Sequence, residues 1–118
     1  MAFVEVKVTF NQSFYDKLNE STFRYAAEET VKEVTNELKE ECETQCPVRT
    51  GNLRDGHYTI VNGLEGSVAN NVEYAPYVVF GTSRQSANNY PQRAMSAIAG
   101  RGIATEIFYK NYNSRIGQ

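Results

Sequence analysis

The segment that decides the fold reads Pro47-Val48-Arg49-Thr50-Gly51-Asn52-Leu53-Arg54. Pro47 is expected to end the helix before it, because the residue that precedes a proline is pushed out of the helical region. Gly51 supplies the backbone freedom that a turn requires. The segment therefore predicts a joint between a helix and a strand through Leu53, and the joint exposes two arginines, Arg49 and Arg54.

Upstream of this joint, the pattern predicts a strand and then one long helix. Residues 2–10 alternate between apolar and polar side chains, as in a half-buried strand. From Asn11 or Ser13, either of which can cap a first helical turn, apolar residues recur every three to five positions as far as Cys42. We expect an amphipathic helix with an acidic outer face.

Downstream of the joint, the sequence predicts a β-hairpin near residues 52–72. Asn62-Gly63 is a strong turn signal because both residues tolerate positive φ, and Gly63 is taken as a structural turn residue. The return strand is expected over about 65–72. The predicted fold class is α+β, in which one long N-terminal helix packs on a small antiparallel sheet of about three strands and short C-terminal helices follow.

A second segment reads Tyr74-Ala75-Pro76-Tyr77-Val78-Val79-Phe80-Gly81-Thr82. It predicts a short helix that Gly81 closes. We expect its aromatic side chains to pack in the core and to leave one tyrosine for an interface.

The polar run 82–89 has nothing to bury and should form an exposed loop, and Pro91 suits the first turn of the next helix. Gly100-Arg101-Gly102 interrupts that helix, and the apolar residues after it favour a last helix over an edge strand.

The chain has 118 residues, 41% of them hydrophobic, and a net charge of -2. This length predicts a single domain, 1–118, and the charge balance disfavours a general nucleic-acid binder. Residues 1–43 hold five basic and ten acidic side chains, a net of -5, and residues 44–118 hold seven basic and four acidic ones, a net of +3. If the two parts lie on different faces, one copy can attract another; otherwise the acidic residues form a solvated helix face.

Several other classes of function have weak support in the sequence. Cys42 and Cys46 are expected to be reduced thiols on one helix face. A zinc site would need two more ligands besides them, and the chain offers only His57 and carboxylates. Asp55 and His57 would share a strand face, but nothing marks a nucleophile, so we expect no catalytic residues, no metal and no cofactor. No apolar run approaches the roughly 18 residues that span a membrane, and no secretion signal is recognisable.

Taken in order, these features resemble the small head-tail joining proteins of long-tailed bacteriophages, a family also labelled tail-completion, neck or minor head-tail connector proteins. The family pattern, a proline followed by Thr-Gly-x-Leu-Arg and later Tyr-Ala-x-Tyr-Val-x-Phe-Gly-Thr, matches Pro47, Thr50–Arg54 and Tyr74–Thr82. The resemblance covers about residues 3–100. Where the family usually has Pro-Phe-Leu-x-Pro-Ala, this chain has Pro91-Gln92-Arg93-Ala94-Met95.

The resemblance implies a structural virion protein that forms a ring, a hexamer or a dodecamer, where the DNA-filled head meets the tail. Its partners would be other copies of itself and the adjacent head-connector and tail proteins, with DNA only as the passing genome. It would be made in the host cytoplasm. The alternative is a tail-tube terminator or another minor capsid or tail component. The candidate interface residues are Arg49, Arg54, Tyr77, Thr82, Ser83, Arg84 and Gln85.

Overall fold

The computed structural model describes residues 4–9, 21–47, 51–84 and 86–116. The predicted α+β class is confirmed, with a long helix packed on a small antiparallel sheet and shorter helices after it. In chain order the elements are β1 (Val4–Thr9), α2 (Ser21–Gln45), α3 (Asn52–Asp55), β2 (His57–Asn62), β3 (Glu65–Asn70), α4 (Ala75–Phe80), α5 (Tyr90–Arg101) and α6 (Ile103–Ile116).

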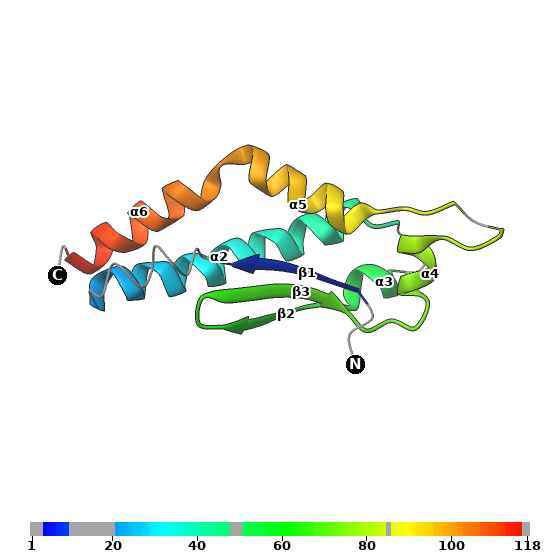
Figure 1. Cartoon of the computed structure of the whole chain (residues 1–118), viewed down its shortest axis with the longest axis horizontal. Coiled ribbons are helices and arrows are strands. Elements are labelled where there is room, and N and C mark those ends of the chain that lie inside the picture. Colours follow the sequence, from blue (N-terminus) through cyan, green and yellow to red (C-terminus); the bar gives the residue numbers. More distant parts are fainter. Residues whose placement is uncertain (1–3, 10–20, 48–50, 85, 117–118) are drawn as a thin grey trace.

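The molecule is elongated, 55 Å long and 21 Å across in both other directions. Helix α2 runs along its length between the sheet on one side and α5 with α6 on the other (Figure 1). Because α2 is covered on two sides, its apolar stripe is continuous and buried. Its buried residues include Ala27, Val31, Val34, Leu38 and Cys42, as the sequence spacing predicts. Part of the predicted long helix, from Asn11 or Ser13 to Glu20, lies outside the described residues.

The sheet is a hairpin of β2 and β3, and β1 pairs antiparallel with the other edge of β3, in the order β1-β3-β2. Asn62 pairs with Glu65, so the central residues of the turn are Gly63 and Leu64 rather than Asn62 and Gly63. Gly63 alone has positive φ there, at 62°. A turn with positive φ only at its first central position belongs to the type II′ class, which favours glycine at that place.

Helix α2 approaches the sheet closely at Gly66 of β3. A β-carbon at Gly66 would overlap the Thr35 side chain of α2. Val68, two residues further along β3, is buried in the core with Leu38 of α2. The absence of a side chain at Gly66 therefore sets the distance between the helix and the sheet.

The predicted strand through Leu53 is wrong at its start. Residues Asn52–Asp55 form the single helical turn α3, in which the Gly56 N–H donates to the Asn52 carbonyl at 2.9 Å. Gly51, with φ of 83°, is the left-handed residue that the predicted turn required. The helical turn is favoured because it buries Leu53 in the main core, and β2 then begins at His57.

The C-terminal part is helical as expected. Pro91 lies in the first turn of α5, and α5 ends at Gly102, whose φ of 64° is left-handed. Helices α5 and α6 then follow α2 back along the molecule in the opposite direction (Figure 1). Tyr90, Ala94 and Ile98 of α5 belong to the main core, and Phe108 and Tyr112 of α6 form an aromatic cluster with Phe23 of α2.

Candidate functional site: an exposed aromatic helix and its loop

Helix α4 lies at one end of the long axis and points three aromatic side chains to solvent. Tyr74, at its N-cap, is 41% exposed, Tyr77 is 61% exposed and Phe80 is 73% exposed. Ala75 and Val79, on the opposite side of the helix, are buried. The prediction that the aromatic residues close the core is therefore wrong, and the small aliphatic residues do so instead. We call Tyr74, Tyr77 and Phe80 the aromatic patch.

The spacing of these residues explains the outcome. Tyr74, Tyr77 and Phe80 are three apart and share one side of the helix, whereas Ala75 and Val79 are four apart and share another. A helix this short on a protein surface can bury only one side. The smaller aliphatic side joins the main core, which also holds the large ring of Tyr90. The sequence also shows the apolar side formed by Ala75 and Val79, but these residues are smaller than the three aromatic ones.

The loop after α4 is exposed, as predicted, and projects beyond α4 at the same end of the molecule (Figure 1). Gly81 has φ of 82° and ψ of 173°, so it is a glycine-specific exit from the helix rather than a left-handed helical cap. The Arg84 N–H donates to the Thr82 hydroxyl at 3.2 Å, and the Asn88 N–H donates to the Val78 carbonyl at 2.9 Å, which closes the loop onto α4. Thr82, Ser83 and Arg84 all face solvent.

Two candidate interface residues, Arg49 and Gln85, lie outside the described residues. Arg54 is exposed on α3, and its Nε donates to Asp55 Oδ1 at 3.1 Å. Asp55 is the last residue of α3, and β2 begins at His57, so the prediction that Asp55 and His57 share a strand face is wrong. Pro47 follows the end of α2 and is exposed.

The expected attraction between acidic and basic parts of different copies is in part an attraction within one copy. Arg101 Nη2 lies 2.9 Å from Glu41 Oε2, and Lys110 Nζ lies 3.3 Å from Glu33 Oε2. Both pairs join the basic C-terminal helices to the acidic helix α2. The Gln45 amide and the Arg101 guanidinium hold the pKa of Glu41 below its usual value. These four charged side chains therefore already form ion pairs within one molecule.

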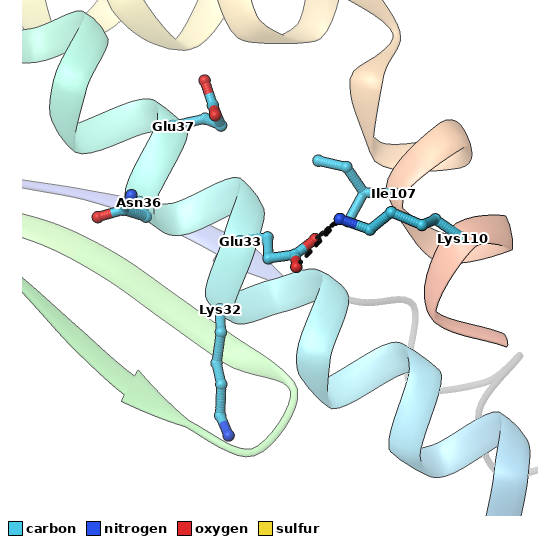
Figure 2. A pocket seen from close by; sticks show the side chains of 6 residues that line it. All are labelled: Lys32, Glu33, Asn36, Glu37, Ile107 and Lys110. Atoms are coloured by element: carbon cyan, nitrogen blue, oxygen red, sulfur yellow. Dashed lines mark hydrogen bonds and ion pairs between the residues drawn. The ribbon is translucent and has the colours of Figure 1, made fainter. Parts of the chain in front are cut away.

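An open hollow lies between α2 and α6, lined by Lys32, Glu33, Asn36, Glu37, Ile107 and Lys110. Figure 2 shows that the Glu33–Lys110 ion pair crosses it, and the Asn111 amide also reaches Glu33 at 3.4 Å. Because the Glu33–Lys110 ion pair joins α6 to α2 across it, the hollow serves the packing of α6 on α2.

His57 is buried, and both of its ring nitrogens are engaged. Nδ1 lies 2.9 Å from the Arg54 carbonyl and Nε2 lies 3.0 Å from the Tyr90 hydroxyl. Because a carbonyl only accepts, Nδ1 carries the proton and Nε2 accepts from Tyr90. Burial lowers the pKa of His57. The imidazole thus joins α3, β2 and α5, and we call this arrangement the histidine link.

Cys42 and Cys46 are free and buried in the core, as expected. Burial raises the pKa of Cys42 to about 12 and also raises the pKa of Cys46. No group of three His, Cys, Asp or Glu side chains that could hold a metal ion occurs in the described ranges. Within the same ranges no helix is both long and apolar enough to cross a membrane.

Comparison of the chain with protein-family models, with curated proteins and with solved structures gives no match.

Proposed function

We propose that this chain is a structural subunit of a ring at the head-tail junction of a long-tailed bacteriophage, and that the aromatic patch is a contact surface of that ring. The observation that carries the proposal is the exposure of Tyr77 and Phe80, at 61% and 73%, on a short helix at one end of an elongated molecule. Clustered exposed apolar residues mark interaction sites, and aromatic residues are enriched in the buried centres of interfaces.

The motif resemblance supports the same surface. The motif contains five residues that have a role at the surface of the fold. The rings of Tyr74, Tyr77 and Phe80 are exposed, Gly81 forms the turn that ends α4, and the Thr82 hydroxyl accepts a hydrogen bond within the loop. A motif whose large aromatic residues face solvent is explained better by a partner than by a core. The ring would join other copies and the adjacent head-connector and tail proteins around passing DNA.

A closed ring needs two different complementary surfaces on each subunit, because head-to-tail contacts repeat around the axis. The aromatic patch, together with Arg84 in the loop that follows α4, supplies one. The Arg84 guanidinium has no partner among the described residues, so it is free to pair with a carboxylate of a neighbour. Two other exposed cations near this end already have partners, since Arg54 pairs with Asp55 and Arg93 donates to the Asn88 side chain.

The test uses a matched pair of tyrosines. Tyr77 on α4 and Tyr109 on α6 are 61% and 60% exposed, and their helices lie toward opposite ends of the molecule (Figure 1). Tyr77→Ser should block ring formation by the purified protein in electron micrographs, and Tyr109→Ser should not. Rings that form equally well with both variants would remove the aromatic patch from the proposal.

The role in the virus is tested separately, by imaging particles assembled without this protein. Filled heads and finished tails that remain separate are the expected result. Joined, infectious particles would refute a joining role, and heads without finished tails would favour the tail-terminator alternative. Supplying the Tyr77→Ser protein should leave heads and tails separate, and supplying Tyr109→Ser should restore joining.

A further inference from the structure

In the part of the chain that the structure describes, the outer edge of β2 is an unprotected strand edge. Because the sheet order is β1-β3-β2, β2 pairs with β3 on one side only. Its sequence, His57-Tyr58-Thr59-Ile60-Val61-Asn62, contains no proline, lysine, arginine or carboxylate. Proteins usually protect such an edge with charge, proline or a covering element, since exposed strand edges pair with other chains.

The other edge of the sheet, strand β1, has charged residues in its sequence and is covered by other elements. Strand β1 carries Glu5 and Lys7 in its sequence, and α4 and α5 pack against it. Helix α2 packs on β2 from the face of the sheet and leaves the edge open, as Figure 1 shows. Of the two sheet edges in the described part of the chain, β2 is therefore the one suited to strand addition.

The side chains at this edge are apolar and exposed. Ile60 is 45% exposed and Val61 is 36% exposed. Strand β2 thus joins a free backbone edge to two branched apolar side chains, the residue class that pairs best across strands.

The turn fixes which backbone groups are free. Asn62 and Glu65 flank a two-residue turn, so they form the hydrogen-bonded pair that closes it. Hydrogen-bonded and non-hydrogen-bonded pairs alternate along an antiparallel ladder, which places Tyr58 and Ile60 in bonded pairs with β3. The N–H and C=O groups of Thr59 and Val61 then point away from β3, toward the open edge.

We propose that two copies of this chain pair through β2, antiparallel and about a two-fold axis at Ile60, to form one continuous sheet. In this register Ile60 faces Ile60 of the second copy, and Thr59 faces Val61 of the second copy. The outward backbone groups of Thr59 and Val61 are those that such a ladder uses. The same strand serves both copies, as an isologous contact requires.

Charge favours a second copy over another partner. Strand β2 is neutral, so two copies of it meet without repulsion. Arg54 precedes the strand and Glu65 follows the turn, and both are exposed. Antiparallel pairing places the beginning of one β2 beside the turn of the other, so Arg54 of each copy approaches Glu65 of the second copy. This surface is separate from the aromatic patch, and the inference does not depend on a role in a virus.

The experiment is a charge exchange at the two-fold axis, measured by sedimentation over a range of protein concentrations. The unaltered chain should dimerise as concentration rises. Ile60→Lys and Ile60→Glu should each weaken the dimer by roughly tenfold or more, because like charges then face each other across the strands. An equal mixture of the two variants should regain dimers, since the introduced ammonium and carboxylate groups would attract each other.

Controls separate this contact from misfolding and from other contacts. Ile60 is half exposed, so both variants should keep the helical circular dichroism of the unaltered chain. Tyr109→Lys places a charge at another exposed site, on α6, where the side chain is 60% exposed against 45% for Ile60, and this variant should dimerise normally. The proposal is overturned if the unaltered chain stays monomeric at every concentration. It is also overturned if the Ile60→Lys protein dimerises as tightly as the unaltered chain, or if the mixture of the two charged variants remains monomeric.

Cross-linking tests the register directly. Opposed residues of a non-hydrogen-bonded antiparallel pair lie within disulfide range, so Ile60→Cys should form an intermolecular disulfide under mild oxidation. Asn62→Cys should not, because it would face Tyr58 of the second copy. The native thiols, Cys42 and Cys46, are buried and should not compete. Equal cross-linking of both variants, or none by Ile60→Cys, would overturn the proposed pairing.

Discussion

Removal of one oxygen from Tyr90 tests how the C-terminal helices are joined to the sheet. Tyr90 is fully buried, and its hydroxyl donates to His57 Nε2 across 3.0 Å, while His57 Nδ1 donates to the Arg54 carbonyl across 2.9 Å. Tyr90→Phe keeps the ring and its packing and deletes only this donor. The buried Nε2 then has neither a partner nor access to water.

The expected cost follows from that loss. A buried acceptor left without its hydrogen bond destabilises a protein by about 1–2 kcal/mol, and the small change in buried apolar area adds little. Tyr77→Phe is the matched control, because the Tyr77 ring is mostly exposed and its hydroxyl can bond to water. We expect that change to alter the free energy of unfolding by less than about 0.5 kcal/mol. Urea unfolding near pH 8 measures both.

The pH dependence supplies a second measure of the same histidine link. Burial lowers the pKa of His57 in the folded chain, whereas the unfolded chain binds a proton near the ordinary histidine value of about 6.5. The stabilisation is therefore complete above that value and is lost as pH falls through the folded pKa. One proton gives a slope of at most about 1.4 kcal/mol per pH unit. His57→Gln should flatten this slope between about pH 7 and pH 5.

Two results would refute this reasoning. One is a Tyr90→Phe protein as stable as the unaltered chain, which would mean that the hydroxyl makes no net contribution. The other is a free energy of unfolding that declines as steeply toward pH 5 in His57→Gln as in the unaltered chain, which would assign the decline to other groups.

Two further changes test the packing of the sheet. Gly66→Ala should destabilise the fold by about 1–3 kcal/mol, since the added methyl group overlaps Thr35 and forces α2 from the sheet. The control is Gly100→Ala, where the added carbon meets nothing and the stability should stay the same or rise slightly. Equal unfolding midpoints for these two variants would contradict the close approach of α2 to the sheet. Asn70→Ala should cost about 2–4 kcal/mol, because the buried Asn70 amide donates to the Leu53 carbonyl at 2.6 Å and its oxygen accepts from the Val72 N–H at 2.9 Å. Thermal unfolding measures both changes, and a midpoint shift for Asn70→Ala no larger than for Gly100→Ala would contradict its bridging role.

Local patterns predicted the elements well where one interaction dominates. The apolar stripe of α2, Gly81 after α4 and Pro91 at the start of α5 each follow from periodicity or backbone restriction within a few residues. Leu53 was misassigned because an apolar residue after a turn suits either a strand or a helical turn. The choice depends on the buried site for Leu53, which only the assembled core provides.

The candidate site was harder to predict, because exposure is a property of the whole fold. Hydrophobicity ranks Phe80 above Ala75 as a core residue, yet Phe80 is 73% exposed and Ala75 is buried. The core that Ala75 joins also contains Tyr90, from a helix ten residues further along, so its composition depends on distant parts of the chain. The histidine link was missed for the same reason, since 33 residues separate its two side chains.

Charge segregation along the chain was likewise a poor guide to contacts between copies. Glu33 and Glu41 are paired within the molecule by Lys110 and Arg101. Exposed ion pairs of this kind contribute about 1 kcal/mol or less each, so they orient α5 and α6 more than they stabilise them. Among the described cations, the better candidates for contacts with another chain are those near the aromatic patch, above all Arg84.

The two proposed surfaces predict different assemblies, and this difference makes them separable. Pairing through β2 is isologous, so it is complete when two copies have met, whereas a ring contact through the aromatic patch repeats from copy to copy. Tyr77→Ser should therefore leave dimers intact while it blocks rings, and Ile60→Lys should do the reverse. A protein that has both contacts at once would stack two rings face to face. A head-tail joint needs one ring with unlike faces, so the β2 pairing would have to open before the ring enters a particle. Ile60→Lys should then join heads to tails at least as fast as the unaltered chain, and slower joining would show that the paired sheet is part of the finished ring.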